Sequence, residues 1–233
     1  KFDAGIDAYL LQAGAGAELT FRDAAGEVGV QLGVRGEIQN GGLNISLYPE
    51  HPIIAYRGFT VNKDNYIFIN QENLIRANVD LLADDGTGLK VYGEPADSAN
   101  DITLSINRVN LGELSTVLPY LPPMSGSLSG DFHLTDKDDV LSAMATIQAD
   151  NFAYDGTQLG NVGVEAIYLP MSDTEHHANA YVSYEGQEVL ECEGTYFTDG
   201  SEAFEGTARL HSFPLPMLNS FMSGTEIALK GFA

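Results

Sequence analysis

Histidines and carboxylates are the side chains of this sequence with the clearest potential for metal chemistry. His176 and His177 are adjacent and lie close to Asp173 and Glu175, and these residue types bind zinc in proteins. Neighbouring residues of a β-strand point to opposite faces of a sheet, so the two imidazoles do not readily reach one ion. The pattern therefore favours the start of an exposed strand over a metal site.

Two acidic segments have the composition of a calcium site, because hard cations bind clustered carboxylates. They are residues 84–88, with the sequence Asp-Asp-Gly-Thr-Gly, and residues 136–139, with the sequence Asp-Lys-Asp-Asp. Neither segment has the loop spacing and terminal Glu of an EF-hand. We interpret both as solvated turns, and we predict no metal ligands and no bound cofactor.

Cys192 is the single cysteine and the only thiol nucleophile of the chain. It alternates with Leu190 on an expected apolar strand face, where burial blunts thiol reactivity, so a small packing residue is the better interpretation. The sequence lacks Gly-x-Ser-x-Gly, Cys-x-x-Cys and the phosphate-binding loop motif. Because no catalytic constellation is present, we predict that the protein is not an enzyme.

Aromatic residues occur in three groups that could contact a ligand. The groups are Tyr48 with Tyr56 and Phe59, Tyr66 with Phe68, and Tyr181 with Tyr184. Tyr181 and Tyr184 are expected on opposite faces of their strand. Packing within a sheet accounts for them most simply. An exposed row of tyrosines would instead indicate a glycan-binding surface.

Alternation of apolar and polar residues with a period of two dominates the chain and identifies the elements that must position these side chains. Residues 28–34 and 43–47 alternate on either side of an Asn-Gly-Gly turn at 40–42, which predicts an antiparallel pair. The same pattern recurs in segments 128–134, 141–149, 162–168, 178–184, 190–192 and 208–210. A mostly antiparallel, all-β protein with roughly fifteen or more strands is expected.

One or two short helices interrupt this pattern. Apolar residues at helical spacing predict a helix over residues 111–118, with Asn110 as its N-cap and Pro119 at its end. Residues 215–221 are a second candidate. The two helix candidates belong to a quasi-repeat of about 100 residues, offset by 104 positions (210 − 106), in which each helix is followed by Met-Ser-Gly and then Leu-x-Gly. We therefore divide the β array into residues 1–105 and 106–233.

A sheet with one apolar face must cover that face. In an elongated, curled antiparallel sheet that forms an open trough, acyl chains can do so, whereas a β-sandwich uses a second sheet. Alternation alone is compatible with both. If the protein is a trough, the residues expected to line the lipid groove are those of the apolar phase, namely Val30, Leu32, Ile45, Leu47, Leu104, Ile106, Leu128, Phe132, Val162 and Val164.

Several segments resemble the TamB family of bacterial envelope proteins and the related AsmA-like proteins. They are residues 43–59, 64–70 and 74–82, then 109–114 through 126–130 with the order strand, short helix and Gly-x-Leu-x-Gly, and finally 152–156 with 159–162. In this order the resemblance extends over most of the chain, from about residue 16 to residue 233.

The resemblance implies a non-enzymatic, internal segment of a long translocation-and-assembly-module protein. Such proteins are anchored in the inner membrane and span the periplasm with a β-taco, which is a long sheet curled into an apolar trough. The implied roles are to conduct phospholipid acyl chains toward the outer membrane, to assist the assembly of outer-membrane proteins, or both. The implied partner is an outer-membrane β-barrel assembly protein. The alternative is a secreted or surface β-sandwich that acts in adhesion or glycan binding.

The charge balance restricts the partners further. The chain has 11 basic and 33 acidic residues and a formal charge of −22, so it is repelled by nucleic-acid phosphates and by anionic lipid surfaces. We expect the acids to lie on the solvated face opposite the apolar phase, where they oppose edge-to-edge association. The acids concerned are Glu18, Glu37, Glu50, Asp131, Glu165, Glu191 and Glu193.

Overall fold

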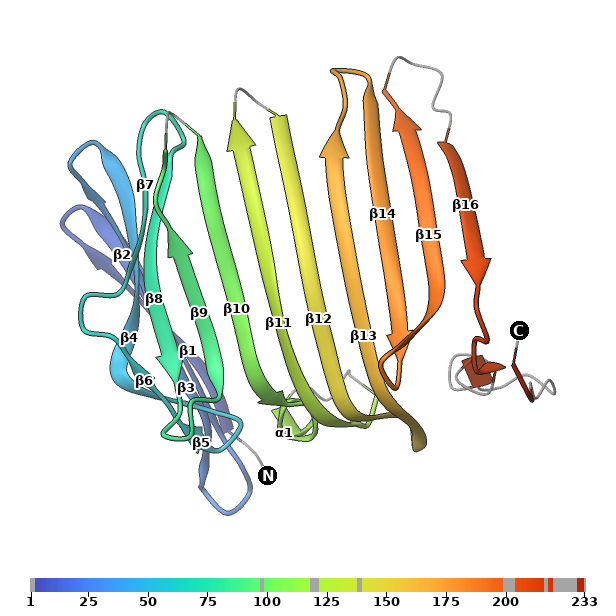
Figure 1. Cartoon of the computed structure of the whole chain (residues 1–233). Helices are drawn as coiled ribbons and strands as arrows, with labels where there is room; N and C mark the ends of the chain where they lie inside the picture. The colour runs from blue at the N-terminus through green and yellow to red at the C-terminus, as the bar shows by residue number, and fades with distance from the viewer. Residues whose placement is uncertain are drawn as a thin grey trace. The chain divides into compact units, whose positions relative to one another are not determined.

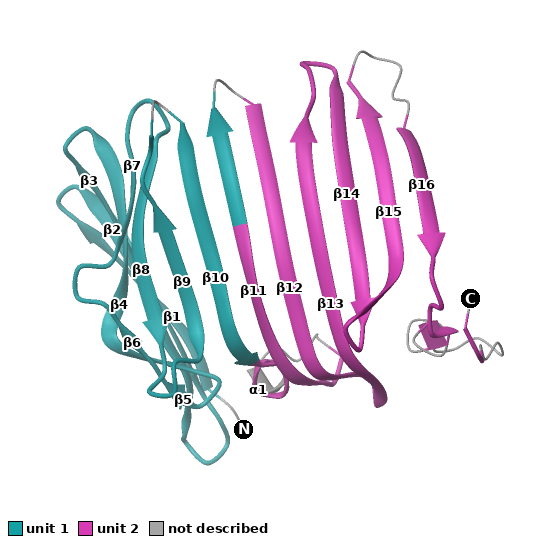
Figure 2. Ribbon diagram, viewed as in Figure 1, with its two compact units in different colours: residues 1–109, 133–139 teal, residues 110–132, 140–233 magenta. Residues whose placement is uncertain are grey.

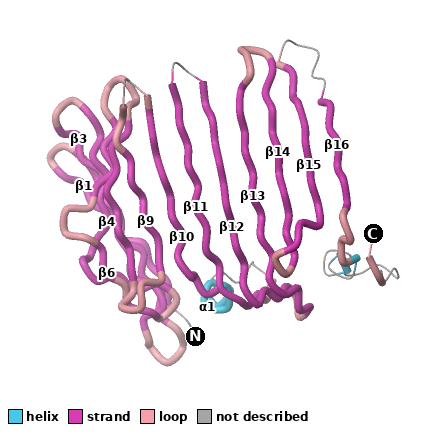
Figure 3. The backbone as a smooth tube through the Cα atoms, viewed as in Figure 1, coloured by secondary structure: helices cyan, strands magenta, loops and turns pink. Residues whose placement is uncertain are grey.

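The computed structural model describes residues 3–96, 99–117, 122–137, 140–198, 204–215, 218–219 and 230–232. In these ranges the chain forms β-strands and one α-helix, and residues 215 and 218–219 lie in a further short helical turn (Figures 1 and 3). The elements are β1 (Asp3–Leu11), β2 (Gly14–Arg22), β3 (Val28–Gln39), β4 (Gly42–Ile54), β5 (Arg57–Gly58), β6 (Thr60–Val61), β7 (Tyr66–Ile69), β8 (Ile75–Leu82), β9 (Gly88–Gly93), β10 (Asn100–Asn110), α1 (Leu111–Val117), β11 (Met124–Lys137), β12 (Val140–Tyr154), β13 (Thr157–Pro170), β14 (Glu175–Tyr184), β15 (Gln187–Phe197) and β16 (Phe204–Leu210).

The strands form one antiparallel sheet in which sequence neighbours are almost always spatial neighbours. The hydrogen-bonded order is β1-β2-β3-β4-β7-β8-β9-β10-β11-β12-β13-β14-β15-β16, with β5 beside β4 and β6 beside β8. The sheet is not closed, because β1 and β16 end this order and no ladder of the described strands joins them. This arrangement differs from a β-sandwich, in which the strands are divided between two packed sheets. The predicted all-β, open antiparallel sheet with a short helix is therefore confirmed.

The chain divides into two compact units, which Figure 2 shows in different colours. Unit 1 comprises residues 1–109 and 133–139, and unit 2 comprises residues 110–132 and 140–233. Strand β11 contributes residues to both units. Each unit is built from consecutive antiparallel strands, so its sheet register follows from local hairpins.

Two-residue turns set this register, at the Asn-Gly pair predicted from the sequence and at one Asp-Gly and one Glu-Gly pair. Both residues of each turn have positive φ, which is the type I′ geometry that matches the twist of a hairpin. The turns are Asn40 (48°) with Gly41 (75°), Asp155 (46°) with Gly156 (78°), and Glu185 (49°) with Gly186 (77°). Each turn directly connects a pair of facing residues in its ladder.

Between β4 and β8 the sheet is completed by short strands and by two asparagine side chains. Leu47 donates its amide to Asn65 Oδ1 at 2.7 Å and accepts from Asn65 Nδ2 at 3.3 Å. Asn62 likewise accepts from the Asp80 amide at 2.8 Å and donates to the Asn78 carbonyl at 3.3 Å. These amides replace backbone partners where no strand continues, so the buried backbone groups stay paired.

The buried core of unit 1 lies where these short strands meet β8. Val61, Val79 and Leu81 are 2 %, 6 % and 5 % exposed. The partly buried side chains that pack against them come from β4, β7, β9 and the β5–β6 connection, and are Leu47, Ile54, Phe59, Ile67 and Val91. Of the aromatic group Tyr48, Tyr56 and Phe59, only Phe59 belongs to this cluster.

The predicted helix is present as α1, and Asn110 is its N-cap. Asn110 Oδ1 accepts hydrogen bonds from the amides of Gly112 (2.9 Å) and Glu113 (3.3 Å). Its Nδ2 donates to Glu113 Oε1 at 3.3 Å. Leu118 and Pro119 lie outside the described residues.

We expect Asn110→Ala to lower the free energy of unfolding by about 0.5–2 kcal/mol, because two helix amides lose their acceptor. Asn110→Ser keeps an oxygen acceptor and should stay close to the wild type. Urea denaturation of the three proteins measures the difference. Equal destabilisation by Ala and Ser would contradict the capping role.

The second half of the quasi-repeat lies mostly beyond what the structure describes. This applies to the Met-Ser-Gly segment at 222–224, to Leu229 and to most of the helix candidate at 215–221. In the described part of the chain, no helix has the length and apolar character needed to cross a membrane.

Candidate functional site: the apolar sheet faces

In unit 1 the sheet register places the apolar phase of successive strands on one face. Residues that face each other across a ladder project from the same side of a sheet. Leu19 of β2 faces Leu32 of β3, Val34 faces Leu47, and Gly36 faces Ile45 of β4. Since Val30, Leu32 and Val34 alternate along β3, the predicted groove residues Val30, Leu32, Ile45 and Leu47 share this face.

The same face continues through β7, β8 and β9 to β10. Ile45 faces Ile67, which faces Ala77. In the next ladders Val79 faces Val91 and Leu81 faces Leu89. Val91 and Leu89 then face Leu104 and Ile106. All six groove residues that the sequence predicts in unit 1 therefore lie on one side of its sheet.

Unit 2 has an apolar face of its own. Val162 faces Ala149 and Tyr184, while Val164 faces Ile147 and Val182. Val182 faces Leu190, and Leu190 faces Leu210 of β16. A Cβ atom added to Gly130 would lie 3.5 Å from Ile147 Cγ1, which places the even-numbered phase of β11, including Leu128 and Phe132, on this side.

All ten predicted groove residues are half-buried, so the face is neither a closed core nor fully solvated. The most exposed side chains of these faces are not among the predicted groove residues. In unit 1 they are Ile6 (73 % exposed), Leu10 (88 %), Leu19, Val34 and Ile38, and in unit 2 they are Tyr196, Phe204 and Leu210. The alternation of Ile6, Ala8 and Leu10 in β1 is the signal that would have identified the first two.

An apolar pocket opens on the unit 1 face beside the buried core. It has a volume of about 120 Å³, and its apolar side chains are Ile45, Leu47, Ile67, Val79, Leu81, Leu89 and Val91. Two of the predicted groove residues, Ile45 and Leu47, therefore belong to a formed cavity.

In both units acidic residues lie on the side of the sheet opposite the apolar phase. In unit 1, Glu18 and Glu37 occupy the polar phase of β2 and β3. In unit 2, Glu165 faces Tyr181, which faces Glu191. Glu193 follows in the same phase. In both units these acids therefore project from the face opposite the apolar phase.

Tyr9, Arg35 and Tyr48 cluster on the polar face of unit 1. The tyrosine rings are 6.3 Å apart, and the Arg35 guanidinium lies 5.5 Å from the centre of the Tyr48 ring. The rings of Tyr9 and Tyr48 lie over Gly16 and Gly33, where any side chain would collide with them. Burial raises the pKa of Tyr48 to about 12. The aromatic rings of this cluster therefore cover two strand glycines of the sheet.

The acidic segment at 84–88 is a turn between β8 and β9, in agreement with its sequence interpretation. The Thr87 amide donates to Asp85 Oδ1 at 3.0 Å, and Arg57 forms an ion pair with the same oxygen at 2.6 Å. These contacts hold the pKa of the Asp85 carboxyl well below its usual range. In the other acidic segment, Asp136 and Lys137 end β11, and residues 138–139 lie outside the described ranges.

Asp85 should contribute to a specific pH dependence of stability. A carboxyl whose pKa is lowered by folding stabilises the fold above the ordinary Asp pKa of about 3.9, and this contribution is lost as the pH falls toward the lowered value. We expect Asp85→Asn to be less stable than the wild type at neutral pH, and we expect this difference to be clearly smaller at about pH 2, because the contribution is lost between the ordinary and the lowered pKa. Urea unfolding at both pH values, with Asp84→Asn as control, tests this; a pH-independent difference would contradict it.

The two adjacent histidines point to opposite faces, as expected from strand geometry. His176 Nδ1 lies 2.6 Å from the Tyr168 hydroxyl, and His177 Nε2 lies 3.1 Å from Glu175 Oε1. Both are half-buried rather than exposed, because β13 and β15 flank β14 on either side. Cys192 faces Ala180 on the apolar side and is half-buried.

No protein-family model, curated protein or solved structure matches this chain. The site therefore has to be interpreted from its own geometry. That geometry consists of two apolar sheet faces, each partly exposed and each backed by an acidic face.

Proposed function

We propose that this protein is a non-enzymatic segment of a bacterial envelope protein whose apolar sheet faces bind phospholipid acyl chains. The observation that supports this most strongly is the apolar face of unit 1, which runs through successive ladders from β1 to β10. Large apolar side chains on it remain exposed, as Leu10 (88 %) and Ile6 (73 %) show. Exposed apolar surface of this extent is typical of an interaction site.

An acyl chain is a suitable ligand for such a face because it requires no directed polar contact. Removing apolar surface from water gains about 25 cal/mol per Å². A chain lying across several strands therefore gains several kcal/mol from Leu, Val and Ile side chains alone. The apolar pocket between β4 and β9 would hold part of such a chain without desolvating any ionised group.

The acidic faces complement this role. They keep the protein soluble while the apolar side is occupied, and they disfavour association of protein molecules through their polar sides. The two-faced sheet and the TamB-like sequence pattern support our proposal that the protein acts in the periplasm as part of a lipid-conducting trough. In this role an outer-membrane β-barrel assembly protein is the expected partner.

The proposal is tested by measuring the transfer of fluorescent phospholipid from vesicles to the delipidated protein. We expect saturable uptake that is reduced by Leu128→Arg and by Val164→Glu. A soluble phosphocholine headgroup without acyl chains should not compete. If the delipidated protein takes up no lipid, or if the headgroup alone competes, the acyl-chain proposal is wrong.

A further inference from the structure

A β-bulge in β15 brings two glutamates to the same face of unit 2. Glu188 faces Ser183 and Leu190 faces Val182, so Val189 has no partner of its own in the ladder. This extra residue shifts the alternation, as bulges do. Glu188 and Glu191, which are three positions apart, consequently both project from the polar face.

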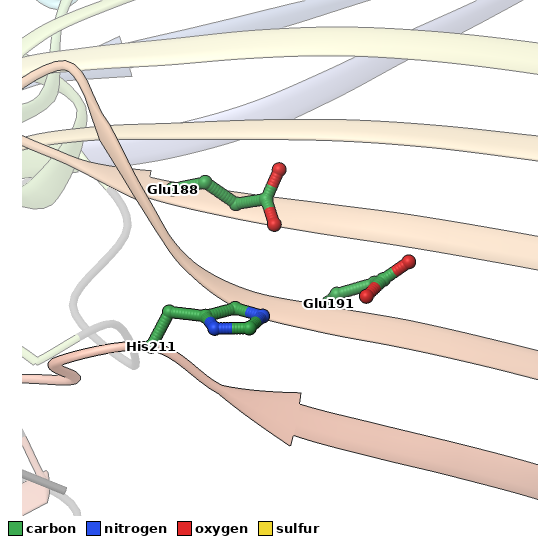
Figure 4. A group of neighbouring side chains, drawn as sticks. All are labelled: Glu188, Glu191 and His211. Atoms are coloured by element: carbon green, nitrogen blue, oxygen red, sulfur yellow. The ribbon is translucent and has the colours of Figure 1, made fainter.

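The same bulge anchors a histidine from the next strand. His211 directly follows β16, and its amide donates to the carbonyl of Val189 at 2.9 Å. Val189 is 3 % exposed, so this anchor lies in a packed part of the sheet. Glu188, Glu191 and His211 each place one ligand atom within 4.8 Å of the others (Figure 4).

We propose that Glu188, Glu191 and His211 form a binding site for Zn²⁺ or a related divalent transition metal. The donor set decides the class of metal, because calcium and magnesium prefer oxygen ligands throughout, whereas an imidazole nitrogen with carboxylates suits zinc. Zinc ligands lie about 2.0–2.2 Å from the ion. Glu188 and His211 are exposed and can rotate to that distance, which leaves a fourth position for water.

An ion pair and a pocket adjoin the three side chains. Arg209 Nη1 lies 3.1 Å from Glu191 Oε2 and 4.0 Å from Glu193. It orients the Glu191 carboxylate from outside, and the other carboxylate oxygen remains available to a metal. Glu188 also lines a pocket of about 500 Å³ together with Thr146, Gln148, Glu165, Tyr181 and Ser183. The site thus borders an open space that is lined in part by polar side chains.

Isothermal titration of the whole chain with zinc chloride tests the site. We expect one saturable zinc ion per chain and at least about tenfold weaker binding in Glu188→Gln and in His211→Ala, since even the loss of an outer-shell partner costs 10–100-fold. Glu193→Gln is the matched control, because it removes the same charge from the same strand face without belonging to the set.

A second readout separates coordination from general attraction to an acidic protein. Cobalt(II) should give a visible absorption band in the wild type and in Glu193→Gln, and the band should be lost in His211→Ala. Absence of saturable zinc binding would overturn the proposal. So would an equal loss of affinity in Glu188→Gln and Glu193→Gln, because that result would mean diffuse attraction by the acidic face.

Discussion

The double variant Leu19→Glu/Leu32→Glu should take up phospholipid at least about tenfold more weakly than the wild type. These two residues face each other across β2 and β3 on the apolar side of unit 1. An acyl chain lying there would meet two carboxylates, and burying a charge without a partner costs well over the ~1.4 kcal/mol that corresponds to a factor of ten. Vesicle-to-protein transfer of fluorescent phospholipid measures the effect.

The neighbouring pair of residues on the same strands provides a closely matched control. Thr20 and Gln31 also face each other, but they project from the polar side. Thr20→Glu/Gln31→Glu adds the same two charges, with the same proximity to each other, and should leave lipid uptake unchanged. Equal loss in both variants would show that added charge, rather than the apolar face, controls uptake.

The second large effect is expected on stability. Leu81→Ala should lower the free energy of unfolding by about 2–5 kcal/mol, because Leu81 is 5 % exposed and packs in the unit 1 core. The loss combines the transfer free energy of the removed atoms with that of the cavity left behind. Urea denaturation followed by circular dichroism measures this change.

Leu10→Ala removes the same atoms from the same apolar face, at a position that is 88 % exposed. We expect its effect on the free energy of unfolding to stay within about 0.5 kcal/mol. The difference between the two variants would show that the apolar face packs as a core at β8 and is exposed to solvent at β1. A Leu10→Ala effect as large as that of Leu81→Ala would contradict the described burial.

Much of the fold can be predicted from the sequence because its determinants are local. Alternation places Val30 and Leu32 on one strand face, and Asn40-Gly41 favours a two-residue turn to the next strand. Consecutive hairpins then define the strand order almost without further information. The assignment of the groove residues to one face in each unit follows from the same two rules.

Other features depend on interactions that alternation does not encode. Asn62 and Asn65 complete the sheet between β4 and β8 through side-chain hydrogen bonds to backbone groups 16 to 18 residues away. Alternation likewise predicts which face a residue occupies but not its exposure. Leu10 and Leu81 therefore look alike in sequence, although one is at the edge strand and the other in the core.

The metal-site candidate could not have been predicted from the sequence either. Glu188 and Glu191 would point to opposite faces of a regular strand, and only the extra residue at Val189 brings them together. His211 follows the next strand, β16. Its backbone hydrogen bond to Val189 in the bulge brings it close to the two glutamates. A bulge has no sequence signature here, so the three ligands appear unrelated until the ladder is known.

Photocrosslinking with a phospholipid that carries a diazirine in its acyl chain tests the central claim most directly. After irradiation and proteolysis, tandem mass spectrometry locates the modified residues of β3. If acyl chains lie on the apolar face, crosslinks should fall on Val30, Leu32 and Val34 and spare Gln31 and Arg35. Crosslinks on Gln31 and Arg35, or equal labelling of both phases, would contradict the proposal that this face binds lipid.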